Sequence, residues 1–149
     1  MIRKLALSLL VGALVAPAHA QVRLEDAWVR ALPPIKKVTA AYLSVVNDSD
    51  QALAIVGGSA PDAGRVEIHR TVEVDGMMRM EQVEGLAVAP GERLELAPGG
   101  VHLMLLDLKY MPQPGDDFEL CLTLASGEEI CTVADTRKSA DAAGHHHHH

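Results

Sequence analysis

Hydrophobic residues between Gln21 and Lys138 recur in short runs, many of them alternating with polar residues, as is typical of β-strands. This pattern predicts strands over residues 38–46, 52–56, 65–74, 77–83, 93–96, 101–108, 118–124 and 129–133. Residues with turn chemistry separate the runs, for example Asp75-Gly76 and Pro98-Gly99-Gly100. Many strands at intervals of about 8 to 12 residues predict an all-β fold, an antiparallel β-sandwich or barrel. The pattern does not give the order of the strands.

The first twenty residues follow a different pattern. Arg3 and Lys4 precede an apolar run over residues 5–15, and the segment closes with Ala18-His19-Ala20. A positive start, a short apolar middle and an A-x-A end predict a secretory signal peptide over 1–20, cleaved before Gln21. An uncleaved anchor is the alternative, although the apolar run is short for a bilayer. We therefore expect one exported domain over 21–138, outside the cytoplasm and without a membrane span after signal cleavage.

Composition limits the partners of that domain. The chain has 149 residues, a length that suits one domain once removable ends are subtracted. Its 13 basic and 20 acidic side chains give a formal net charge of −7. A general nucleic-acid binder needs a basic face to neutralise phosphates, so nucleic acid is not an expected partner.

The two cysteines fall on the two arms of the last predicted hairpin. Cys121 and Cys131 are equidistant from Ser126, so they face each other across the strands if the connecting loop has an odd number of residues. In an oxidising compartment this placement favours a cross-strand disulfide. A metal-thiolate or redox role stays open as an alternative, although the chain has no C-x-x-C spacing.

Histidine and methionine are confined to a few positions. Apart from the signal peptide and the terminal run, the only histidines are His69 and His102. Period-2 alternation places His102 and Met104 on one face of their strand. If Asp75-Gly76 is a two-residue hairpin turn, Thr71 opposes Met80, which makes His69 and Met80 diagonal neighbours on one face. The four side chains can therefore meet around one ion.

The donor types indicate which ion this is. Carboxylates suit Mg²⁺ or Ca²⁺ and thiolates suit Zn²⁺, whereas two imidazoles and two thioethers suit Cu(I). Taken singly, a methionine on a strand is usually core packing and a lone histidine is usually a surface or hydrogen-bonded group. The shared register of His69, Met80, His102 and Met104 favours a metal site instead. Met78 has the same strand parity as Met80, and is either an accessory ligand or part of an exposed docking surface.

The spacing His69-x10-Met80-x21-His102-x-Met104 lies within Val66-Glu-Ile-His-Arg-Thr-Val, Asp75-Gly-Met-Met-Arg-Met and Pro98-Gly-Gly-Val-His-Leu-Met-Leu. In these features the chain resembles the periplasmic copper chaperone family PCuAC over residues 22–133. The resemblance implies a cupredoxin-like β-sandwich that holds Cu(I) through these four residues. It also implies delivery toward the dinuclear copper centre of cytochrome c oxidase, with subunit II or another copper chaperone as the acceptor.

Two features depart from the family pattern. Arg70 follows His69 where many members have a second methionine, and the cysteine pair is not a feature that we associate with the family. The segment 139–149 has the composition of a flexible linker followed by the histidines 145–149 (His145, His146, His147, His148 and His149). This tail is either a native extension or a tag. Imidazoles without thioethers prefer Cu(II), so the tail is also a possible Cu(II) site.

Three other functions compete with a copper chaperone. General periplasmic copper binding or resistance would use the same ligands. Blue-copper electron transfer would require a cysteine thiolate among the ligands, and the cysteines lie outside the His/Met set. An adhesion or assembly module would bind no metal. The chain has no motif of a nucleophile with a base and no phosphate-binding glycine loop, so we do not expect an enzyme.

Overall fold

The structure is a computed structural model that describes residues 21–142, and it is nearly all β. Ten strands follow one another along the chain: β1 (Val22–Arg30), β2 (Thr39–Asn47), β3 (Leu53–Ser59), β4 (Arg65–Val74), β5 (Met77–Gln82), β6 (Leu86–Val88), β7 (Arg93–Leu96), β8 (Val101–Leu106), β9 (Asp117–Leu124) and β10 (Glu129–Arg137). A short 3₁₀ helix, η1 (Ala140–Ala142), follows the last strand. The predicted all-β class is confirmed.

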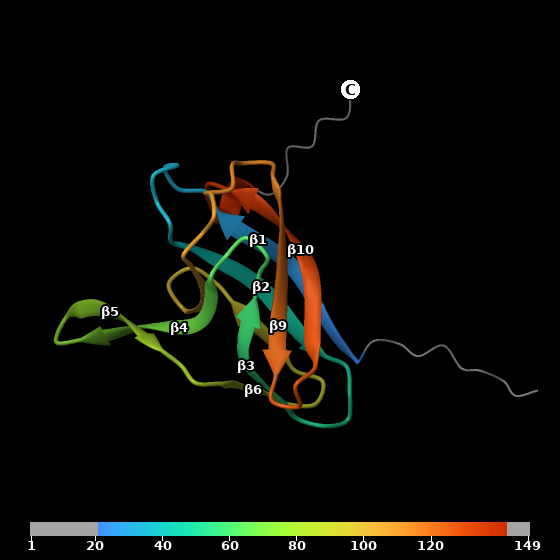
Figure 1. The fold of residues 1–149 in the computed structure, drawn as a ribbon. Helices are drawn as coiled ribbons and strands as arrows, with labels where there is room; N and C mark the ends of the chain where they lie inside the picture. Colours follow the sequence, from blue (N-terminus) through green and yellow to red (C-terminus); the bar gives the residue numbers. More distant parts are fainter. Residues whose placement is uncertain (1–20, 143–149) are drawn as a thin grey trace, which may run out of the picture.

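The strands form one rolled sheet in the order β5-β4-β8-β2-β1-β10-β9-β3-β6, with β7 beside β2. A further pairing of β3 with β4, through Gly58 and Val66, closes the rolled sheet into a barrel. Gly58 also lies close to the backbone of β9, because a Cβ there would be 2.6 Å from the carbonyl oxygen of Cys121. The β4–β5 hairpin projects from the body of the roll (Figure 1).

Alternation along the strands sorts side chains between the interior and the outer face. Ile68 of β4 and Leu103 and Leu105 of β8 are buried in the core with residues from every other long strand of the roll. Each such apolar side chain removes surface from water and contributes roughly 1.5 to 3 kcal/mol of hydrophobic free energy. The neighbouring positions in the sequence, which include His69, His102 and Met104, therefore project to the opposite face of the sheet.

All eight predicted strands are present, with ends that shift by a few residues. The prediction missed β1 and β6. In β1 the alternation is broken by a bulge between Glu25 and Trp28, at which Asp26 adopts a positive φ of 53°. Strand β8 ends earlier than predicted, at Leu106, because Asp107 takes a φ of 54°. One pairing, β1 with β10, is parallel and not antiparallel.

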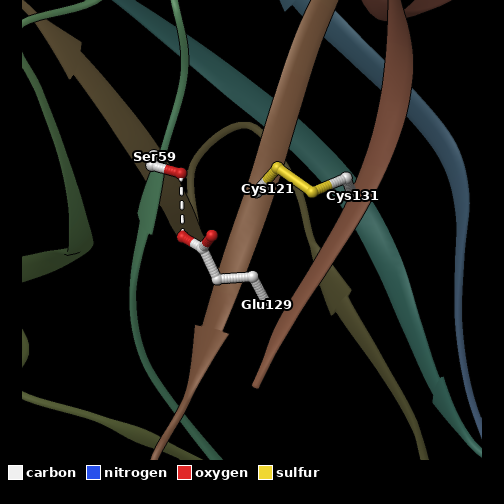
Figure 2. Close-up of a disulfide and its surroundings, with 4 residues drawn as sticks. All are labelled: Ser59, Cys121, Glu129 and Cys131. Atoms are coloured by element: carbon white, nitrogen blue, oxygen red, sulfur yellow. Dashed lines mark hydrogen bonds between the residues drawn. A yellow bond between two sulfur atoms is a disulfide. The ribbon is translucent and has the colours of Figure 1, made fainter. Parts of the chain in front are cut away.

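A disulfide joins Cys121 and Cys131, the pair for which the sequence favours this bond. The two residues are direct partners in the β9–β10 register, which is centred on Ser126 as expected. Figure 2 shows the bond crossing between the strands, beside a 3.0 Å hydrogen bond from Ser59 to Glu129. Because Leu120 and Leu122 face the core, the disulfide lies on the outer face and links the strands without filling the interior.

The predicted signal peptide, 1–20, and the histidines 145–149 lie outside the described residues. Within residues 21–142, no helix combines the length and apolar character that crossing a membrane requires.

Candidate metal centre

The two domain histidines lie opposite each other on adjacent antiparallel strands. His69 of β4 and His102 of β8 are direct Cα partners, and their ring centroids are 6.2 Å apart. Both project from the outer face, because the neighbouring residues Ile68 and Leu103 point into the core. Two segments that are thirty-three positions apart in the sequence, counting from 69 to 102, therefore bring their imidazoles together.

Each imidazole has one nitrogen in a hydrogen bond and the other buried without a partner. Nδ1 of His102 donates to the carbonyl oxygen of Gly100 at 2.9 Å, and Nε2 has no partner. Nε2 of His69 lies 2.9 Å from Oε2 of Glu67, and Nδ1 has no partner. A carboxylate only accepts, so Nε2 of His69 carries a hydrogen, and in the neutral ring the lone pair lies on Nδ1.

Buried polar atoms without a partner are rare in folded proteins, because desolvation without a hydrogen bond is costly. In the described part of the chain four side-chain atoms are in this state, and two of them are these ring nitrogens. A metal-binding histidine characteristically donates from one ring nitrogen to a fixed acceptor and offers the other to the ion. The two rings thus fit a metal ion, with Nδ1 of His69 and Nε2 of His102 as the free nitrogens.

The predicted methionines lie on the same face as the histidines. Met104 follows His102 by two residues on β8, is partly buried, and pairs with Glu67 of β4. Met80 of β5 pairs with Thr71, as the two-residue turn at Asp75-Gly76 predicts, and is therefore a diagonal neighbour of His69. This register is confirmed, whereas the participation of the sulfur atoms in binding stays a prediction.

The two methionines differ in exposure. The side chain of Met80 is 62% exposed and that of Met78, two residues earlier on the same face, is 64% exposed. Met104 lies on a strand in which Leu103 and Leu105 are fully buried. The β8 side of the face is thus fixed by the core, and the β5 side is open to solvent.

Aromatic side chains border His102 on the side of β2, opposite to His69 of β4. The ring of Tyr42 lies 6.3 Å from that of His102, and Trp28 packs against Tyr42 with ring centroids 4.4 Å apart. The guanidinium of Arg30 lies over Tyr42, 5.3 Å from its ring centroid. Burial raises the pKa of the Tyr42 hydroxyl above its usual value. Next to these rings, His102 is only 3% exposed.

Sequence reasoning missed the groups that hold the imidazoles. Glu67 shares strand parity with His69 and lies two residues before it, so alternation in Glu67-Ile68-His69 was the signal that could have identified it. The carbonyl of Gly100 carries no side-chain signal. Trp28 is buried and packs against Tyr42, on the face that bears the histidines.

Arg70 replaces no ligand in this arrangement. Its parity places it on the opposite side of β4 from His69, and its guanidinium lies 3.9 Å from Glu81. In residues 21–142, no group of three or more His, Cys, Asp or Glu side chains is placed to hold a metal ion.

Comparison with known proteins gives consistent relatives. The family described as "Putative lipoprotein LpqE-like" matches residues 22–135. A curated protein of Leifsonia xyli, named "Putative lipoprotein Lxx21020", is 32% identical over 107 residues, which are 71% of this chain and 63% of that protein. An uncharacterized protein of Rickettsia prowazekii, RP573, is 30% identical over 70% of this chain and 60% of its own. The chain therefore spans about three fifths of the length of these curated relatives.

Solved structures give the same fold. The Cu(I) form of DR1885 from Deinococcus radiodurans is 30% identical, with a TM-score of 0.65 over 84% of this chain and 83% of that one. The copper-bound PCuAC domain from PmoF2 is 23% identical, with a TM-score of 0.66 over 82% of this chain and 97% of that domain. The similarity to the PmoF2 domain establishes the β-sandwich fold.

Proposed function

We propose a function from the premise that this chain belongs to the LpqE-like family of PCuAC type. The protein is a copper metallochaperone, and Cu(I) is its cargo. His69, Met80, His102 and Met104 are its ligands. Residues 21–138 form the copper-binding domain.

The single observation that carries this proposal is the pair of unpartnered, buried ring nitrogens on directly opposed strands. Two imidazoles alone suit several metals, but thioethers next to them favour soft Cu(I). The set is uncharged, so a bound ion keeps its single positive charge, which favours Cu(I) over the harder, more highly charged Cu(II).

The unequal exposure of the two sides fits a protein that both retains and releases copper. His102 and Met104 are held by a strand of the core, whereas Met80 is open to solvent. An acceptor approaching from the β5 side would replace Met80 first, because this ligand is accessible without unfolding the barrel. A chaperone, unlike an enzyme, needs no further reacting group at this face.

The proposed function includes export of the protein and delivery of its copper. The signal peptide over 1–20 would direct the domain to the periplasm. There it would pass copper to subunit II of cytochrome c oxidase or to another copper chaperone. If native, the histidines 145–149 would collect Cu(II), which imidazoles without thioethers bind well.

A Cu(I) competition titration of residues 21–138 tests the ligand set. We expect one Cu(I) per domain, sulfur scattering in X-ray absorption, and a loss of affinity of at least about 100-fold for His69→Ala or His102→Ala. Met77→Leu is a matched control, since Met77 is exposed but has the opposite strand parity to Met80. Copper neighbours that are only nitrogen and oxygen would exclude the thioether ligands.

Colour distinguishes the electron-transfer alternative. Blue copper requires a thiolate ligand, and both cysteines are joined in a disulfide on β9 and β10. We expect no intense blue absorption with Cu(II). Such absorption would favour electron transfer over the chaperone.

A further inference from the structure

We propose that Glu67 is a positioning residue for copper: it holds the Nε2–H of His69, so that Nδ1 is the nitrogen offered to the ion. This inference rests on the proposed function, because it concerns one ligand of that site. It adds Glu67 and Arg65, which the His/Met pattern does not include.

The arrangement runs along one face of a single strand. Arg65, Glu67 and His69 alternate on β4, so their side chains project from the same side. Nη1 of Arg65 lies 2.9 Å from Oε1 of Glu67, while Oε2 of the same carboxylate lies 2.9 Å from Nε2 of His69. Because each oxygen has its own partner, the carboxylate cannot rotate without breaking one of the two contacts.

Burial makes this contact effective. The side chains of Glu67 and His69 are only 19% and 18% exposed, so water competes weakly for the hydrogen bond between them. A hydrogen bond to a charged acceptor is stronger than a neutral one, which favours the tautomer with hydrogen on Nε2. The lone pair then remains on Nδ1, the atom without a partner.

The opposite histidine reaches the same state by a different route. Nδ1 of His102 donates to a backbone carbonyl, that of Gly100, which the strand itself fixes. His69 depends on a side chain that a single substitution can remove. The two halves of the site therefore respond differently to mutation, and only the His69 half should lose its tautomer.

The test compares Glu67→Ala with Glu67→Gln in the copper-free protein and then with Cu(I). Nitrogen-15 NMR of the imidazoles at about pH 8, above the ordinary titration range of histidine, reports which nitrogen carries the hydrogen. We expect Nε2–H at His69 in the wild type and a mixture of tautomers in Glu67→Ala, with His102 unchanged. Cu(I) affinity should fall about 10- to 100-fold in Glu67→Ala.

Glu67→Gln is the conservative rescue, because an amide oxygen can still accept from Nε2. We expect it to retain the tautomer and a Cu(I) affinity within about threefold of the wild type, far from the loss typical of a missing outer partner. Glu73→Ala is a matched control: Glu73 lies on the same face of β4 but pairs with Met78 of β5 and not with a histidine. It should change neither measurement.

Two results would overturn the proposal. If Glu67→Ala leaves the His69 tautomer unchanged, the carboxylate does not position the ring. If Glu67→Gln retains the tautomer but loses as much affinity as Glu67→Ala, the carboxylate acts through its charge or as a ligand. Failure of the proposed function is separate, since it would appear as unchanged Cu(I) binding in His69→Ala while the copper-free tautomer still reports on Glu67.

Discussion

Two hairpins of this barrel have the same simple topology and opposite surroundings. In β9–β10 the side chains Phe118, Leu120, Leu122 and Leu124 are all buried, and a disulfide links the strands on the other face. In β4–β5 every residue of β5 is exposed, and a two-residue turn is the only covalent link. The first hairpin is part of the barrel wall, and the second extends beyond it (Figure 1).

The difference separates stability from ligand access. Burial and the cross-link are concentrated where the sheet must stay closed, and the exposed methionines are on a strand that contributes little to the core. Strands with few buried contacts open locally at lower free energy than the whole domain unfolds. The β5 side can therefore move while the β8 side and the barrel remain folded.

The largest difference between the hairpins should be in core packing. Leu120→Ala removes a fully buried side chain and should lower the free energy of unfolding by about 2 to 5 kcal/mol. Met78→Ala, at a position 64% exposed, should change it by no more than about 0.5 kcal/mol. Urea unfolding measures both, and similar losses would show that β5 packs as tightly as β9.

Removal of the disulfide should follow in magnitude. The double substitution Cys121→Ser and Cys131→Ser should cost about 2 to 3 kcal/mol of unfolding free energy, because the cross-link restricts the unfolded chain. Cu(I) affinity should stay the same, since the bond is on the other hairpin. A changed copper affinity would contradict the separation of the two regions.

Met80→Leu tests the exposed hairpin directly. Leucine has a similar volume but no sulfur, so we expect about a tenfold loss of Cu(I) affinity, equivalent to about 1.4 kcal/mol. Unfolding free energy should be unchanged because the side chain is 62% exposed. Met104→Leu should lose a similar affinity, and a competition titration that finds no loss for either variant would remove that methionine from the ligand set.

The smallest effect should come from the turn of the exposed hairpin. Gly76 has a φ of +76°, which alanine adopts only with strain of about 1 kcal/mol. Gly76→Ala should therefore increase hydrogen exchange of the β5 amides roughly fivefold and leave β9 unaffected. Equal acceleration in both strands would mean that the hairpin opens only with the whole barrel.

Local patterns determined what could be predicted from the sequence. Asp75-Gly76 and the alternation on both sides predict the pairing of Thr71 with Met80, and the structure has this pairing. The facing of Cys121 and Cys131 follows from the same kind of symmetry. Strand β1 escaped detection because its bulge reverses the parity between Leu24 and Val29, both of which contact the core.

Contacts between distant strands were beyond such patterns. Alternation places His69 and His102 on faces of their own strands, but their direct opposition depends on β4 being next to β8, which no local signal states. The contact of Tyr42 with His102 was equally unpredictable, because β2 and β8 are far apart in the sequence. Alternation does place Glu67 on the same face as His69. The sequence does not show that the two side chains are in contact, which the 2.9 Å distance establishes.

The parallel pairing of β1 with β10 affects how the barrel resists a pulling force. Because these first and last strands run the same way, the start of β1 and the end of β10 lie at opposite ends of the pair. Opposing pulls at the two ends would strain their interstrand hydrogen bonds in shear, all at the same time, instead of opening them one by one. Such a fold should withstand stretching better than one whose terminal strands are antiparallel neighbours.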